Sequence, residues 1–149
     1  MAAETPRSAL RRAAQTIHPA GPRVAGPPDV PREIIPMEIF RPEDVPAEQP
    51  ENMPGVKIRW VIDRKRGAEN FAMRVFEVDP GAATPLHNHW YEQEMYILDG
   101  QGILVGDKGQ SPIKEGHVLW VAPNERHQIK NTGQTTLKFI CCVPQKPKP

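Results

Sequence analysis

Proline is distributed very unevenly along this chain, and that distribution limits what the chain can fold into. Eleven of the eighteen prolines lie within the first 55 residues of the 149. Proline fixes φ and has no backbone N–H to donate, so this density excludes long helices and central strands. We therefore expect residues 1–55 to form an extended, proline-rich arm over a surface. Residues 34–40 are apolar enough to add one edge strand.

From residue 56 the pattern changes to short apolar segments with turn signals between them. No helical period is present in residues 56–143. Short strands at regular spacing are typical of an all-β sandwich or barrel, so we expect a single barrel domain over 56–143 and a disordered tail over 144–149. Strands are expected at residues 56–63, 71–78, 94–98, 102–106, 117–122, 125–131 and 135–143.

Charge and hydropathy exclude two classes of partner. The net charge is +1 with a pI of about 7.8, and no basic stripe is present, so we expect no nucleic acid. No apolar run approaches the ~18 residues of a membrane span, so we expect no membrane partner. Residues 1–30 contain no secretory core and are arginine-rich, which leaves a loosely ordered bacterial arm or an organelle transit peptide.

Two adjacent cysteines, Cys141 and Cys142, lie on the last expected strand. Neighbouring side chains on a strand point to opposite faces, so these two do not predict a structural disulfide. We interpret them as a reduced pair, which predicts a cytoplasmic location. A redox role or a second metal site is the alternative.

The densest chemistry lies at His87, His89 and Gln93. All three have odd numbers, so an extended chain places them on one face of a strand. His127 lies far downstream, where an antiparallel neighbour could bring it opposite. Three imidazoles and one oxygen donor suit a single divalent transition ion, namely Mn, Fe, Zn, Ni, Cu or Co. We therefore predict a metal site made of these four residues.

The spacing of these residues resembles the two sequence motifs of the cupin superfamily. The matching positions are Gly81, His87, His89, Gln93 and Gly100, then Gly116, Ala122, Asn124, His127 and Asn131. Gln93, Ala122 and Asn124 replace the glutamate, proline and glycine of that pattern. Asparagine tolerates positive φ, so the turn at Asn124 is expected to survive.

The resemblance implies a cupin-type β-barrel, also called a double-stranded β-helix or jelly roll, with a mononuclear metal centre. It also implies a homodimer, in which an N-terminal strand crosses to the partner subunit in many small cupins. The identity of the third ligand stays open at this point. Gln93 is in phase with the histidines and correctly spaced to Gly100, whereas Glu94 would take its place if a β-bulge shifted the phase.

A neutral glutamine ligand would leave the ion its full charge, which favours Lewis-acid chemistry. Together with this chemistry, the resemblance to small cupins implies an enzyme of the isomerase or lyase type that acts on a small keto acid or sugar acid. Glu94 or Tyr91 is the candidate proton acceptor. Arg74 is the one cation in an apolar strand and could bind a substrate carboxylate bidentately. Tyr96 and Trp120 are expected to pack within the barrel.

Two alternatives remain for the function. One is a dioxygenase or an oxalate-decarboxylase-like cupin that uses the same ligands. The other is a non-catalytic module that binds a small molecule, because a fold does not by itself define a function.

Overall fold

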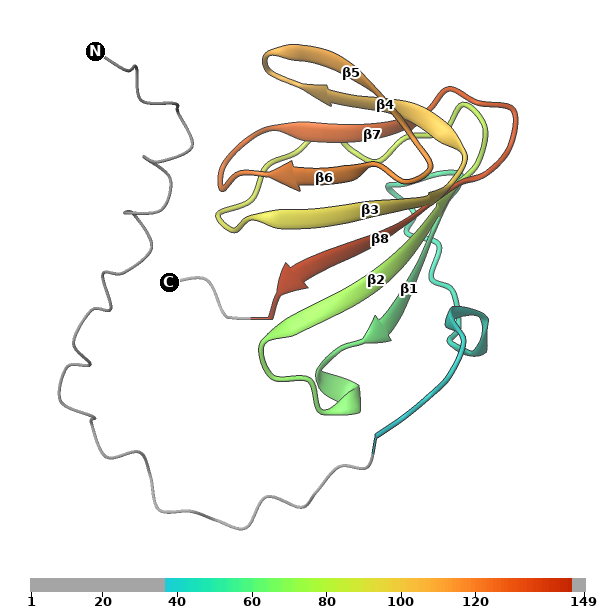
Figure 1. Cartoon of the computed structure of the whole chain (residues 1–149), viewed down its shortest axis with the longest axis vertical. Helices are drawn as coiled ribbons and strands as arrows, with labels where there is room; N and C mark the ends of the chain where they lie inside the picture. The colour runs from blue at the N-terminus through green and yellow to red at the C-terminus, as the bar shows by residue number, and fades with distance from the viewer. Residues whose placement is uncertain (1–36, 146–149) are drawn as a thin grey trace, which may run out of the picture. The chain divides into compact units, whose positions relative to one another are not determined.

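The computed structural model describes residues 37–145, which form two antiparallel β-sheets (Figure 1). The five-stranded sheet has the order β1-β2-β8-β3-β6, and the three-stranded sheet has the order β5-β4-β7. This arrangement confirms the predicted all-β class. The strands are β1 (Val56–Ile62), β2 (Phe71–Val78), β3 (Gln93–Asp99), β4 (Gln101–Gly106), β5 (Gly109–Lys114), β6 (Val118–Val121), β7 (His127–Asn131) and β8 (Leu137–Pro144).

Helical structure in residues 37–145 is limited to two short 3-10 turns, η2 (Pro42–Asp44) and η3 (Arg64–Arg66). No helix in this part of the chain has the length and apolar character needed to cross a membrane. Strand β5 was not predicted. It buries only Ile113 and exposes its other residues, so its sequence carries no alternation that would reveal a strand.

The predicted edge strand and tail need correction. Residues 37–40 are the described part of the segment 34–40, and they form no strand; Met37 and Ile39 are fully exposed. The prolines that flank this segment remove donors that a sheet edge would need. At the other end, β8 extends to Pro144, and the Gln145 N–H donates to the Asn70 carbonyl at 2.9 Å. Residues 1–36 and 146–149, including most of the predicted arm and tail, lie outside the described residues.

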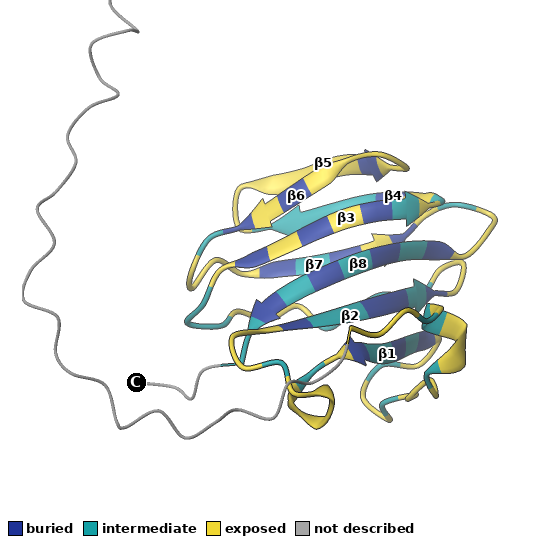
Figure 2. Cartoon of the chain, turned by 60° about the horizontal axis from the view of Figure 1, so that its bottom comes forward, coloured by how far each residue is buried: buried dark blue, intermediate teal, exposed yellow. Residues whose placement is uncertain are grey.

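The core lies on the inner face of the five-stranded sheet, where alternate residues are buried (Figure 2). Phe76 on β2 and Phe139 on β8 stack with their ring centroids 4.9 Å apart. Burying a side chain of this size stabilises the fold by about 2–3 kcal/mol. Tyr96 and Trp120 contradict the prediction: they are 46% and 61% exposed, because strand alternation turns them outward.

Two asparagines stabilise the turns on either side of β7. Asn131 is fully buried; its Nδ2 donates to the carbonyls of Val78 and Thr135, both at 2.8 Å. Asn124 has a φ of 66°, as the sequence predicted. Its N–H donates to the His89 carbonyl at 2.7 Å, so this turn is tied directly to the loop that carries His89.

Candidate metal centre

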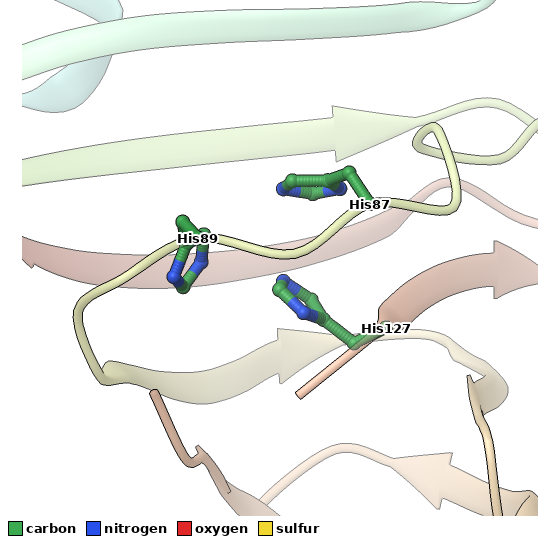
Figure 3. A group of neighbouring side chains, drawn as sticks. All are labelled: His87, His89 and His127. Carbon is green, nitrogen blue, oxygen red and sulfur yellow. The ribbon is translucent and has the colours of Figure 1, made fainter. Parts of the chain in front are cut away.

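Three histidines from two separate segments point toward one another (Figure 3). His127 is the first residue of β7, and it lies opposite His87 as predicted: each backbone N–H donates to the other's carbonyl, at 2.8 and 3.1 Å. His87 and His89 belong to the loop between β2 and β3, which corrects the expectation of a continuous strand there. The convergence therefore depends on backbone pairing between this loop and β7, with bridges at Ala83–Lys130 and His87–His127, and on the Asn124 turn, not on strand alternation alone.

Thr84 fixes the start of this loop, and the sequence reasoning did not single it out. Its Oγ1 accepts from the Ile129 N–H at 2.9 Å, and its carbonyl accepts from the Gln128 side chain at 2.8 Å. Thr84 is 7% exposed. In the sequence, a threonine shortly before a His-x-His pair, on a segment rich in small residues, is the signal that could have identified it.

The three rings are close enough to share one ion. Their centroids are 4.5 Å apart for His87 and His127, 4.9 Å for His89 and His127, and 5.6 Å for His87 and His89. One nitrogen from each ring lies within 4.8 Å of the others. Two nitrogens bound to one ion at ~2.1 Å lie at most ~4.2 Å apart. The rings therefore need to move inward by less than ~1 Å.

Hydrogen bonding sets the tautomer of all three imidazoles. In each ring Nδ1 lies close to a backbone carbonyl, which can only accept, so Nδ1 carries the proton and Nε2 of a neutral ring keeps its lone pair. In His89, Nε2 also lies 2.9 Å from the Gln93 Oε1, a second acceptor, which is the arrangement of two donors that face one cation. The pairs are His87 with Pro85 at 2.9 Å, His89 with Tyr91 at 2.6 Å, and His127 with Glu125 at 3.0 Å. Nε2 of His127 is enclosed and has no hydrogen-bond partner among the described residues. A buried acceptor of this kind, beside two similar nitrogens, fits a divalent metal ion.

The environment of His127 also favours the neutral form that binds metals. Burial lowers the pKa of His127, and the nearby His87 and His89 lower it further. The hydrogen bond to the Glu125 carbonyl raises the pKa and is a smaller effect than burial, though larger than that of either histidine. At neutral pH the imidazole is therefore unprotonated at Nε2, and protons compete weakly with a metal ion.

Strand β3 separates the two candidates for the oxygen ligand. Gln93 is buried, with its Oε1 2.9 Å from Nε2 of His89, whereas Glu94 is exposed on the opposite face beside Trp120 and Cys142. Two donors bound at ~2.1 Å and ~90° from each other lie ~3.0 Å apart. The Gln93 oxygen and the His89 nitrogen already have the spacing of two neighbouring ligands.

A small cavity lies next to the histidines. The space in it that the centres of water molecules can occupy is about 60 Å³, which suits a few waters or a small ligand. His87, Gln93 and His127 line it together with Arg74, so four of the predicted site residues meet here. Apolar side chains form most of the remaining wall. Among these, Met53 was not anticipated, because it lies in the proline-rich arm.

Tyr91 and Glu94, the two predicted proton acceptors, do not line the cavity. Tyr91 packs its ring flat against His89, with the centroids 3.9 Å apart, and is not among the residues that line the cavity. Glu94 is separated from the cavity by the thickness of the sheet. Neither residue is placed where it could serve as a proton acceptor for a ligand in the cavity.

The fold and the site together define a small β-barrel protein with a triple-histidine candidate metal centre. The chain belongs to the cupin superfamily: the sequence profile of the cupin domain (Cupin_2) matches residues 74–143. It is 32% identical over 111 residues to an oxalate-binding protein of Thermotoga maritima, a match that covers 70% of this chain and 92% of that protein.

Two further proteins are similar to this chain. The chain is 36% identical over 66 residues to the protein MJ1618 of Methanocaldococcus jannaschii, covering 44% of this chain and about half of that protein, 53%. In structure it is similar to the polyketide cyclase RemF from Streptomyces resistomycificus. That comparison has a TM-score of 0.71 and 30% identity, and it covers 76% of this chain and 82% of RemF.

Proposed function

We propose that this protein is a mononuclear metal cupin that binds a small oxygenated acid in the cavity beside the ion. The proposed ligands are His87, His89, Gln93 and His127, holding one ion of Mn, Fe, Zn, Ni, Cu or Co. The observation that carries the proposal is the enclosed Nε2 of His127, which has no hydrogen-bond partner within residues 37–145 and lies beside two further imidazoles that are each held at Nδ1 by a backbone carbonyl.

When bound, a divalent ion supplies a Lewis acid that polarises an oxygen atom of the ligand. The chain's own residues provide the surroundings. Ile58, Phe76 and Phe139 line the cavity with apolar surface, which lowers the local dielectric and strengthens polar interactions. Gln93 adds no negative charge, so it leaves the ion's charge available to an anionic ligand.

Binding without turnover is the function that the site supports best. Apart from the proposed metal ligands, the described residues that line the cavity include no carboxylate and no imidazole that could accept a proton. A relative that is 32% identical carries the name of an oxalate-binding protein, which supports a small acid as the ligand.

A Lewis-acid enzyme of the isomerase or lyase type is the second candidate. The neutral Gln93 at the position of a usual glutamate favours it, because an ion with its full charge is the stronger Lewis acid. The 30% identity to a polyketide cyclase supports an enzyme in a second way. No feature of the described residues favours the dioxygenase alternative.

The test begins with metal content. Protein purified without chelator is analysed for transition metals by mass spectrometry, and the Gln93→Glu variant serves as a matched control. We expect about one ion per chain in both proteins. Binding of keto acids, sugar acids and oxalate is then measured by calorimetry on metal-loaded and chelator-treated protein, and we expect binding only when the metal is present. Absence of transition metal under every loading condition contradicts the proposal.

Turnover decides between the two candidates. Each acid that binds is followed by NMR with and without O₂. Unchanged ligand under both conditions supports the binding protein, conversion without O₂ supports the Lewis-acid enzyme, and O₂ uptake supports the dioxygenase.

We also propose a homodimer and a cytoplasmic location. The exposed apolar residues Val118 and Trp120 on the outer sheet face support a contact between two copies. Cys141 and Cys142 are both free, which supports a reducing compartment.

A further inference from the structure

Among residues 37–145, Arg74 is the only lysine, arginine, aspartate or glutamate that lines the cavity. It lies on β2, and its guanidinium carbon is 5.1 Å from the ring centroids of both Trp60 and Phe76. Its Nη2 donates to Sγ of Cys141 at 2.9 Å. These contacts hold the guanidinium at the cavity wall, because aromatic faces attract a cation.

The guanidinium has no anionic partner in residues 37–145: no carboxylate oxygen there forms an ion pair with it. Its Nε is enclosed and makes no hydrogen bond in this part of the chain. The Cys141 thiol is a weak acceptor, and burial raises its pKa and keeps it neutral. A partly buried cation with only one weak hydrogen-bond acceptor destabilises the protein unless an anion binds to it.

We infer that Arg74 anchors a carboxylate, and that the ligand is a 2-oxo acid or dicarboxylate of only ~two to four carbons, given the size of the cavity. This inference rests on the proposed metal site. One oxygen group of the acid would face His87, Gln93 and His127, and its carboxylate would accept two parallel hydrogen bonds from Arg74. A simple monocarboxylate satisfies only one of these ends. The cavity has room for roughly four to six water-sized groups, about the size of a short acid and fewer than the heavy atoms of a six-carbon sugar acid.

The apolar wall makes this pairing selective. Ile129 and Met95 line the cavity between the polar groups and offer no other hydrogen-bond donor to a charged oxygen. In such surroundings a bidentate ion pair is stronger than at the surface, and an acid that leaves Arg74 unpaired is disfavoured.

The test is calorimetric titration of metal-loaded protein with oxalate, pyruvate and malonate, using acetate and gluconate as negative controls. The same titrations are run on Arg74→Met, which removes the charge, and on Arg74→Lys, which keeps it without the planar donor pair. Arg59→Met is the matched control. Arg59 lies on the neighbouring strand β1 and does not line the cavity; it forms an ion pair with Glu77 at 3.8 Å and donates to the Val45 carbonyl at 2.6 Å. Metal content is measured for every variant.

We expect Arg74→Met to weaken binding of the short acids by ~10- to 100-fold with unchanged metal content. Arg74→Lys is expected to bind with intermediate affinity, and Arg59→Met to match the wild type. Metal-loaded wild type that binds none of the short acids, or Arg74→Met that binds them as tightly as wild type, overturns the inference while leaving the metal site intact. A wild-type protein that binds no transition metal instead overturns the proposed function. If Arg74→Met does not fold, Arg74→Lys with wild-type affinity for every acid overturns the inference.

Discussion

Replacing His127 with leucine should have opposite effects on metal binding and on the stability of the metal-free protein. Structural zinc sites with four ligands bind with ~10–16 kcal/mol, so one ligand contributes ~3 kcal/mol. Loss of His127 should therefore weaken metal binding by ~100-fold or more. With metal at ~1,000 times its Kd, the wild type gains ~4 kcal/mol of stability, and the variant should lose most of that gain.

In the metal-free protein, replacing His127 with leucine should instead increase the free energy of unfolding. The enclosed Nε2 of His127 has no hydrogen-bond partner in the described part of the chain, and an unsatisfied buried group costs ~1–3 kcal/mol. Leucine removes that group but also removes the Nδ1 hydrogen bond to the Glu125 carbonyl, which contributes ~0.5–1.5 kcal/mol. The two side chains are similar in volume, so the net result is a stabilisation of ~1 kcal/mol, or ~3–4 °C in Tm for a domain of this size.

The assay is thermal and urea unfolding of wild type and His127→Leu, each with excess chelator and with added Zn²⁺. His117→Leu is the matched control, because His117 is exposed and lies outside the site. It should leave both the metal response and the metal-free stability close to wild type. A His127→Leu protein that still responds fully to Zn²⁺, or that loses several kcal/mol in chelator, would refute the reasoning.

Three further changes have defined outcomes. Met53→Ala enlarges the cavity and should admit acids one or two carbons longer than wild type accepts, as measured by calorimetry; an unchanged length limit would show that Met53 does not set it. The pKa of Cys142 is raised by burial and then by the charge of Glu94. Both effects disfavour the thiolate, so alkylation of Cys142 at pH 8 should be slower than alkylation of a free thiol and should accelerate as pH rises. The Glu94→Gln variant should be alkylated faster than the wild type, and equal rates in the two proteins would contradict this. Charged residues on the exposed outer face, introduced by Trp120→Glu and Val118→Lys, should shift the protein toward monomer in light scattering. A wild type that is already monomeric would contradict the proposed homodimer.

The fold class could be predicted because strand alternation and turn chemistry are local. Phe139 and Cys141 are buried and Cys142 is half-buried, as period-two alternation requires. The same rule failed where a strand lacks contrast between its two faces. Strand β5 buries one residue, and Trp120 is a large apolar side chain on the outer face of the sheet's edge strand β6.

The metal donors were also accessible from sequence, because the His-x-His spacing and the distant His127 require only that two segments lie antiparallel. The choice between Gln93 and Glu94 was not accessible. It depends on where β3 begins, and the loop before it is irregular, so counting odd residues could not establish the phase with certainty.

The amino-acid sequence by itself determined which side chains are available and, in strands that alternate clearly between apolar and polar residues, which face each one occupies, since both follow from bonds between near neighbours. Only the tertiary structure decided how they combine. The contact between Arg74 and Cys141 joins residues 67 positions apart, and it exists because β2 and β8 are neighbours in the sheet. The orientation of each imidazole in the site depends on the backbone carbonyl that lies against its Nδ1. The cavity wall includes Met53, which comes from the proline-rich arm. Such contacts arise from sheet order and packing, which no local pattern encodes.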